Sequence, residues 1–257
     1  MKVVITGATA GIGRALAEEF GRNGHDLWIT GRRTERLEEI KTTLEQQYGI
    51  SVHYSCFDIR EREAVEQAVA EIAAAWDVPD VLINNAGLAL GLSGVENGDV
   101  DQWETMIDTN IKGLLYMTRH IAPLMLRAKS GHIINIGSTA GKSVYPNGNV
   151  YCATKHAVVA LSEGMRIDLM NYNIKVTAIN PGMVDTEFSR VRFSGDEAKA
   201  SKTYEGFEPL HAADVARTAY YCATLPDHVC VNELTMTCTR QANGIFKTTD
   251  AIVEAQQ

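Results

Sequence analysis

Apolar residues fall into two alternating kinds of segment along the chain. Short runs rich in valine and isoleucine alternate with longer stretches in which apolar residues recur every three or four positions. The short runs predict strands buried on both faces, since a half-exposed strand would alternate apolar and polar residues. Seven strands are predicted, at residues 2–6, 27–30, 52–57, 81–84, 132–137, 174–179 and 233–237.

The longer stretches predict helices between these strands. They cover residues 11–23, 34–48, 61–75, 100–128, 151–171 and 212–223. Strands that alternate with helices form parallel sheets through right-handed crossovers. We therefore expect an α/β fold: a single doubly wound Rossmann-type domain over 1–257, with a seven-stranded parallel sheet flanked by helices.

Two segments lie outside this alternation. Residues 183–210 form a connection that is long and polar for a compact domain, which predicts a lid over a site. Residues 240–257 follow the last predicted strand and form a C-terminal tail.

Charge and composition exclude several functions. The net charge of -8 repels nucleic acid. No apolar run is long enough for a membrane helix, and the first residues enter a strand at once, so we expect a cytoplasmic protein without a membrane partner. The 5 cysteines include no CxxC pair and no histidine partner at zinc spacing, so we expect reduced, mostly buried thiols and no metal site.

A glycine-rich turn joins the first predicted strand to the first predicted helix. It reads Thr6-Gly7-Ala8-Thr9-Ala10-Gly11-Ile12-Gly13. Glycine is needed where the chain turns sharply and where a pyrophosphate approaches backbone N–H groups at a helix start. A tight turn without a ligand is the alternative, but the strand before it and the helix after it favour binding.

The TGxxxGxG spacing of this turn resembles that of the short-chain dehydrogenases/reductases. Later turns continue the resemblance, above all Asn84-Asn85-Ala86-Gly87 and Pro181-Gly182. Together they imply a dinucleotide site at the strand ends. The residues implied for cofactor binding are Thr6, Gly7, Thr9, Ala10, Gly11, Ile12, Gly13, Arg32, Arg33, Asp58, Ile59, Asn85, Ala86, Gly87, Tyr151, Lys155, Pro181, Gly182, Val184 and Thr186.

The residues after the second strand indicate which dinucleotide binds. An NAD enzyme would place a carboxylate there for the ribose hydroxyls, whereas this chain has Gly31-Arg32-Arg33. A guanidinium can hold a 2′-phosphate bidentately. We therefore expect NADP(H), with Arg32 as the main anchor and Arg33 as the second. Two solvated arginines at a helix start are the alternative. The resemblance also assigns Asp58 to the adenine amino group, although a helix N-cap would explain it too.

Tyr151 and Lys155 stand four residues apart, so their side chains share one helix face. A nearby ammonium favours phenolate, and we expect Lys155 to lower the pKa of Tyr151. With Ser138 and Asn110 they match the catalytic tetrad of the short-chain dehydrogenases/reductases. The resemblance implies that Tyr151 exchanges a proton with the substrate oxygen, which Ser138 orients. It further implies that Lys155 holds the nicotinamide ribose and that Asn110 carries a water linking the lysine to solvent.

Several strings, among them DTNIKGLLYMTR and TEFSRVRFSGD, resemble one branch of the family: the NADP-dependent 3-hydroxy acid and serine dehydrogenases and the sulfoacetaldehyde reductases. This implies reversible reduction of a small semialdehyde with a terminal anion, such as sulfoacetaldehyde to isethionate or malonic semialdehyde to 3-hydroxypropionate. The residues expected to bind the substrate are Ser138, Tyr145, Tyr151, Arg192 and Gln241. Arg192 is the expected cation, although a solvated loop arginine is the alternative. Carboxylate and sulfonate stay equally open.

Two other functions remain open. One is a short-chain reductase of a neutral carbonyl substrate of the sugar, steroid or 3-ketoacyl type, and the other is a non-catalytic NADPH-sensing protein. The family further suggests a homotetramer in which Gln241 or Phe246 reaches the site of a neighbouring subunit.

Overall fold

The seven apolar runs form one parallel sheet in the computed structural model, which describes residues 1–192, 195–196 and 204–249. The strand order is β3-β2-β1-β4-β5-β6-β9. Valine, isoleucine and leucine fill the strand interiors, and all four residues of β4 are buried. The strands are β1 (Lys2–Ile5), β2 (Asp26–Gly31), β3 (Val52–Cys56), β4 (Val81–Asn84), β5 (Gly131–Ile136), β6 (Ile174–Pro181) and β9 (Glu233–Met236).

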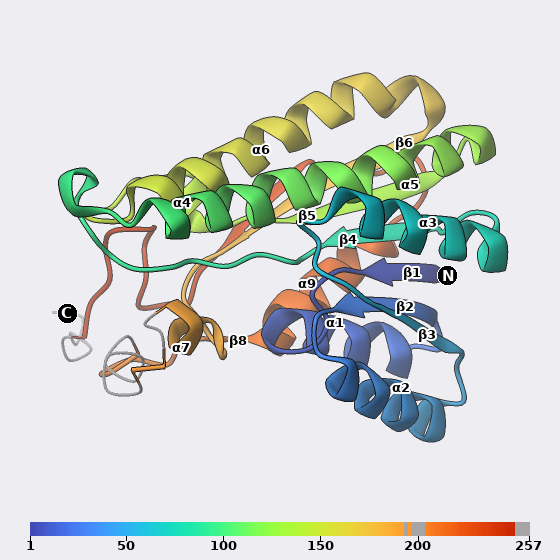
Figure 1. Ribbon diagram of the computed structural model, residues 1–257, viewed down its shortest axis with the longest axis horizontal. Coiled ribbons are helices and arrows are strands. Elements are labelled where there is room, and N and C mark those ends of the chain that lie inside the picture. The colour runs from blue at the N-terminus through green and yellow to red at the C-terminus, as the bar shows by residue number, and fades with distance from the viewer. Residues whose placement is uncertain (193–194, 197–203, 250–257) are drawn as a thin grey trace, which may run out of the picture.

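Helices cover both faces of the sheet (Figure 1). On one face α1 (Gly11–Arg22), α2 (Thr34–Tyr48) and α9 (Ala212–Ala223) bury an apolar cluster that includes Phe20 and Leu37. On the other face α3 (Arg62–Trp76) and α5 (Leu114–Ala128) bury a second cluster that includes Met117 and Ile121, and α6 (Asn149–Leu169) packs beside them. The predicted fold class is therefore confirmed.

The prediction of one helix over 100–128 is wrong in one respect, because the structure has three helical segments there. An α-helix, α4 (Val100–Ile107), is followed by one π-helical segment, η2 (Asp108–Gly113), and then by α5. Asn110 lies in η2, where its buried side chain bonds to another loop. Gly113 lies against Ile59, and a Cβ on it would come within 2.8 Å of the isoleucine side chain. The wider π turn places Asn110, and such turns occur often at functional sites.

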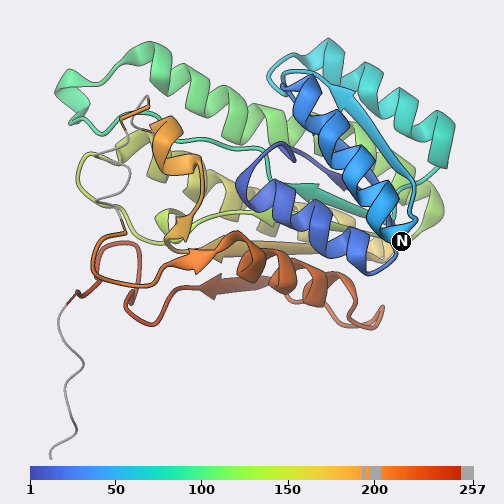
Figure 2. The same cartoon turned by 90° about the horizontal axis from the view of Figure 1, so that it is seen from below.

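The loops at the carboxyl ends of the strands lie together at one end of the molecule (Figures 1 and 2). Ligands bind at this end in doubly wound sheets, where the strand order reverses between β1 and β4. The predicted lid contributes β7 (Val184–Asp185), α7 (Phe188–Arg192) and β8 (Leu210–His211), and β7 pairs with β8. Its residues 193–194 and 197–203 lie outside the described residues, as do 250–257 of the predicted tail.

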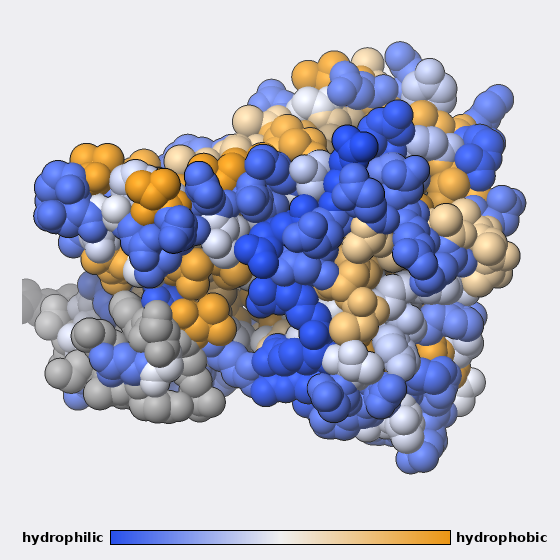
Figure 3. All heavy atoms as spheres, viewed as in Figure 1, coloured by the Kyte–Doolittle hydropathy of each residue, from blue (hydrophilic) through white to orange (hydrophobic). Residues whose placement is uncertain are grey.

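Hydrophilic residues cover most of the face drawn in Figure 3, and apolar residues gather near α4. Val95 and Val100, at that end, are 70% and 57% exposed. Within the described residues no helix is long and apolar enough to cross a membrane. The five cysteines are free; Cys152, Cys222 and Cys238 are buried and Cys56 is exposed.

Candidate active site

A cavity of about 950 Å³ opens at the carboxyl ends of the strands. It runs from the glycine-rich turn and the start of α2, past the ends of β3, β4 and β5, to α7 and the first residues of the tail. The predicted catalytic, cofactor-binding and substrate-binding residues line it, with two exceptions. Thr6 and Asn110 lie behind the wall and hold the loops that form it. Residues from positions 7 to 241 are thus brought together at one site.

Two glycines of the glycine-rich turn, Gly7 and Gly13, have no room for a side chain. Gly7 has a φ of +67°, and a Cβ on it would lie 2.8 Å from Cα of Ala86. A Cβ on Gly13 would lie 2.2 Å from the carbonyl oxygen of Gly7. Thr6 ties this turn to the next one, because its Oγ1 accepts hydrogen bonds from the N–H groups of Asn85 and Ala86, each 3.0 Å away. The result is a backbone cradle at the start of α1, which suits a pyrophosphate.

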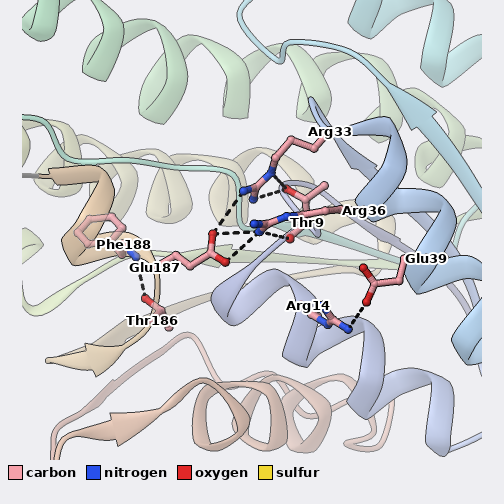
Figure 4. Close-up of polar contacts among 8 residues, drawn as sticks. All are labelled: Thr9, Arg14, Arg33, Arg36, Glu39, Thr186, Glu187 and Phe188. Carbon is pink, nitrogen blue, oxygen red and sulfur yellow. Dashed lines mark hydrogen bonds and ion pairs between the residues drawn. The ribbon is translucent and has the colours of Figure 1, made fainter. Parts of the chain in front are cut away.

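A cluster of charges lies beside this cradle at the start of α2 (Figure 4). Arg33 donates from Nε and Nη2 to Oγ1 of Thr9, at 3.2 and 2.8 Å. Arg36 donates from Nη1 to the carbonyl oxygen of Thr9 at 3.3 Å. Both arginines also bond the carboxylate of Glu187, from the segment between β7 and α7. We call Arg33, Arg36 and Glu187 the charge triad.

Arg32 and Asp58 line the same end of the cavity as Arg33. Arg32, the first choice from sequence, is 61% exposed, and its Nη1 lies 3.7 Å from Oδ2 of Asp58. Asp58 also receives a two-pronged contact from Arg60, at 3.0 and 2.8 Å. These hydrogen bonds outweigh burial and lower the pKa of Asp58. Asp58 is therefore an ionised acceptor at the cavity wall.

Asn110 connects η2 to the turn after β4. Its Oδ1 accepts from the N–H of Leu88 at 2.8 Å, and its Nδ2 donates to the Leu88 carbonyl at 2.8 Å and to Oγ1 of Thr154 at 3.0 Å. A Cβ on Gly87 would lie 3.2 Å from Asn110 Oδ1 and 3.5 Å from Nζ of Lys155. Asn110 thus fixes the loop that Lys155 faces.

Tyr151 and Lys155 are buried on one face of α6 at the other end of the cavity. Nζ of Lys155 donates to the carbonyl oxygen of Ile136 at 3.0 Å and lies 6.0 Å from the centre of the Tyr151 ring. Burial lowers the pKa of Lys155 to about 8. Ser138, whose Oγ accepts from the N–H of Ala140, lies on the turn after β5.

The expectation that Lys155 lowers the pKa of Tyr151 is wrong in this structure. Burial of the hydroxyl has the largest effect and raises the pKa of Tyr151 well above its ordinary value of 10.0. A hydrogen bond with Ser138 and the charge of Arg192 oppose this rise only in part. Tyr151 is consequently a protonated hydroxyl, a donor, at neutral pH.

Arg192, at the end of α7, points its guanidinium between two tyrosines. The carbon at its centre lies 5.4 Å from the ring centre of Tyr145 and 5.6 Å from that of Tyr151. Nε is 3.4 Å from the carbonyl oxygen of Gly91. Nη2 is buried and has no hydrogen-bond partner within the described part of the chain. A buried N–H without an acceptor is costly, so this group is poised for one.

Gln241 lines the cavity, but its amide is already engaged. Oε1 accepts from the N–H of Met183 at 2.8 Å, and Nε2 donates to the carbonyl oxygen of Asn243 at 2.9 Å. A Cβ on Gly182 would lie 2.2 Å from that Oε1. The contacts make Gln241 a clamp between the tail and the turn after β6, rather than the free donor expected from sequence.

Sequence reasoning missed Arg36, Arg60 and Glu187. Arg36 stands three residues after Arg33 on α2, so the helical period could have indicated it. No local signal could have indicated Glu187, which lies 151 residues from Arg36 along the chain.

A glycine cradle, a basic cluster and a buried Tyr-Lys pair in one cavity define the class of this protein. The model of the short chain dehydrogenase family matches residues 1–197. The chain belongs to this family and is an oxidoreductase.

Individual relatives are similar over nearly the whole chain. It is 50% identical over 237 residues to the NADP-dependent 3-hydroxy acid dehydrogenase YdfG of Salmonella typhi, covering 92% of this chain and 94% of that one. It is 43% identical over 245 residues to sulfoacetaldehyde reductase 2 of Chromohalobacter salexigens, covering 95% and 96%. The solved closed form of serine dehydrogenase complexed with NADP+ matches with a TM-score of 0.90 and 45% identity, covering 100% of both chains.

Proposed function

We propose that this protein is an NADP-dependent oxidoreductase that interconverts a small hydroxy acid and its semialdehyde. The observation that carries the substrate class is the buried, unpartnered Nη2 of Arg192 beside Tyr151. A carboxylate or sulfonate would supply the acceptor that this Nη2 lacks, and charge-assisted bonds of this kind are strong. The similarity to 3-hydroxy acid dehydrogenase and sulfoacetaldehyde reductase supports the same class.

NADP(H) is the cofactor, and the residues present fit it. The glycines let the turn pack closely on Ala86 and on the start of α1, and this turn lines the cavity where a pyrophosphate would lie. Arg32 and Arg33 line the cavity where a 2′-phosphate needs cations, and Asp58 lines the same wall. When bound, NADPH supplies the hydride that reduces the carbonyl carbon.

The chain's own residues supply the proton and the orientation. The raised pKa keeps Tyr151 protonated, so its hydroxyl donates a proton to the carbonyl oxygen during reduction. Ser138 hydrogen-bonds and orients that oxygen. Lys155, held on the Ile136 carbonyl, would bind the nicotinamide ribose hydroxyls, and Asn110 holds the loop opposite it. For the reverse reaction Tyr151 must first lose its proton, which makes oxidation the more alkaline direction.

At the far side of the substrate, Arg192 and Tyr145 receive the anion. Burial raises the pKa of Tyr145, and the neighbouring Arg192 opposes this only in part, so Tyr145 stays a neutral donor. A planar carboxylate and a tetrahedral sulfonate can both accept from one guanidinium and one hydroxyl. The proposal therefore covers malonic semialdehyde and sulfoacetaldehyde. The proposal also includes a substrate lid over 183–210, the C-terminal tail over 240–257 and a homotetramer. A measurement of the molecular mass in solution tests the homotetramer.

The direct test is the initial rate of NADPH oxidation with malonic semialdehyde, sulfoacetaldehyde and propanal, with NADH as the control cofactor. We expect both anionic aldehydes, or one of them, to exceed the neutral propanal, and NADPH to exceed NADH. A preference for propanal would overturn the substrate class and favour the neutral-carbonyl alternative. Tight NADPH binding without turnover of any aldehyde would favour the sensing protein instead.

A further inference from the structure

The charge triad places a carboxylate in a basic site. Glu187 accepts from Nη1 of Arg36 with both oxygens, at 2.9 and 3.0 Å, and lies 3.3 Å from Nη1 of Arg33 (Figure 4). Burial alone would raise the pKa of Glu187, but the bonds from the two arginines lower it. The carboxylate is therefore an anion held by two guanidinium groups.

The Arg33 guanidinium would also face the 2′-phosphate of NADP. Arg33 and Glu187 both line the cavity, next to Thr9 and the cradle, whereas Arg36 holds Glu187 from behind. A carboxylate and a phosphate present the same kind of oxygen acceptor to a guanidinium, and two anions on one donor repel each other. The adenosine of NAD has no 2′-phosphate and therefore does not compete with Glu187 for Arg33.

Glu187 also connects the two ends of the cavity. Thr186, before it, lies against Gly11 of the cradle, where a Cβ would come within 3.2 Å of the threonine. Phe188, after it, has its ring 5.9 Å from the ring of Tyr151. Glu187 therefore lies in a short segment that contacts the cradle through Thr186 and the reacting end through Phe188.

We propose that Glu187 reduces the preference for NADPH over NADH by competing with the 2′-phosphate for Arg33. The proposal rests on NADP(H) as the cofactor of this site. NADPH must displace the carboxylate from Arg33, which weakens NADPH binding, while NADH leaves the charge triad in place. Glu187 thus limits the affinity for NADPH and favours its release, a step that limits turnover in many enzymes.

The test measures the dissociation constants of NADPH and NADH for the purified protein by fluorescence titration. In Glu187→Gln we expect NADPH to bind roughly three- to tenfold more tightly and NADH to bind within about twofold of the wild type. The double variant Arg33→Gln/Glu187→Gln should bind NADPH no more tightly than Arg33→Gln alone, since the two anions compete only through Arg33. Glu39→Gln is the matched control: it removes a neighbouring carboxylate whose partner, Arg14 at 2.9 Å, lies outside the charge triad (Figure 4).

Unchanged or weaker NADPH binding in Glu187→Gln would overturn the proposal. An equal loss for NADPH and NADH would overturn it too, because Glu187 would then be a strap that holds either cofactor in place. A gain of the same size in Glu39→Gln would reduce the effect to net charge. Failure of the wild type to bind NADPH would overturn the cofactor assignment itself, a result separate from these three.

Discussion

The two ends of the cavity are built in opposite ways. At the reacting end Tyr151 and Lys155 are 8% and 6% exposed, and Tyr151 packs in a buried apolar cluster that includes Met106 and Ala140. At the phosphate end the side chains of Arg33 and Glu187 are 43% and 40% exposed, and their contact joins the start of α2 to the segment between β7 and α7. Burial fixes protonation and geometry at one end, whereas exposed charges at the other can exchange partners. Substitutions at the reacting end should therefore remove most of the catalytic activity. Substitutions at the phosphate end should change the affinity for the cofactor by smaller steps.

Tyr151→Phe should give the largest effect. Loss of the proton donor should lower kcat for semialdehyde reduction by about 10²- to 10⁴-fold, while the affinity for NADPH stays within about twofold. Steady-state rates and fluorescence titration check this. Tyr54→Phe is the control, because the Tyr54 hydroxyl donates to the exposed Glu38 outside the cavity. Retention of substantial activity in Tyr151→Phe would remove the contrast between the two ends.

Substitutions at the phosphate end should have moderate effects confined to one cofactor. Arg33→Gln should weaken NADPH binding by about tenfold, since Arg33 is held on Thr9 and faces the cavity. Arg32→Gln should cost less, because Arg32 is 61% exposed. NADH binding should change little in both. Dissociation constants for the two cofactors decide the order, and a larger loss in Arg32→Gln would restore the order expected from sequence.

His132 is a buried group outside the cavity, so its substitution tests burial without catalysis. The effect of His132→Gln should be the smallest of those considered. It is as buried as Lys155 but lies on β5 outside the cavity, bonded to Oγ1 of Thr177 at 2.8 Å. Burial lowers its pKa from 6.5 to about 3. Between these values the unfolded chain binds more protons, so the free energy of unfolding should fall as the pH is lowered, by at most about 1.4 kcal/mol per pH unit.

Denaturant unfolding at neutral and mildly acidic pH checks this slope. It should be shallower in His132→Gln and unchanged in His228→Gln, which removes an exposed histidine. Activity of His132→Gln at neutral pH should match the wild type. An equal slope in His132→Gln and the wild type would assign the acid sensitivity to other groups.

The contrast between the two ends also explains what the sequence predicts well. Strand runs such as β4 are buried on both faces, so their composition alone reveals the sheet. Tyr151 and Lys155 share a helix face by spacing, and Ser138 stands two residues after the end of β5, so the ends of regular elements place them together.

Features that depend on packing across the chain were missed. The π turn places Asn110 to bond Leu88 of a distant loop, and the raised pKa of Tyr151 arises mainly from burial. The engaged amide of Gln241 and the reach of Glu187 to Arg36 likewise depend on segments far apart in sequence. Local patterns carry no record of such contacts.

The most direct test of the central claim compares Arg192→Gln with the wild type on malonic semialdehyde, sulfoacetaldehyde and propanal. If Arg192 binds the substrate anion, kcat/KM for the preferred anionic aldehyde should fall by about 10²-fold while kcat/KM for propanal stays within about threefold. Arg192→Lys should recover part of the loss, since it restores the charge without the fork of the guanidinium. An equal fall for anionic and neutral aldehydes, or no fall for either, would contradict the account.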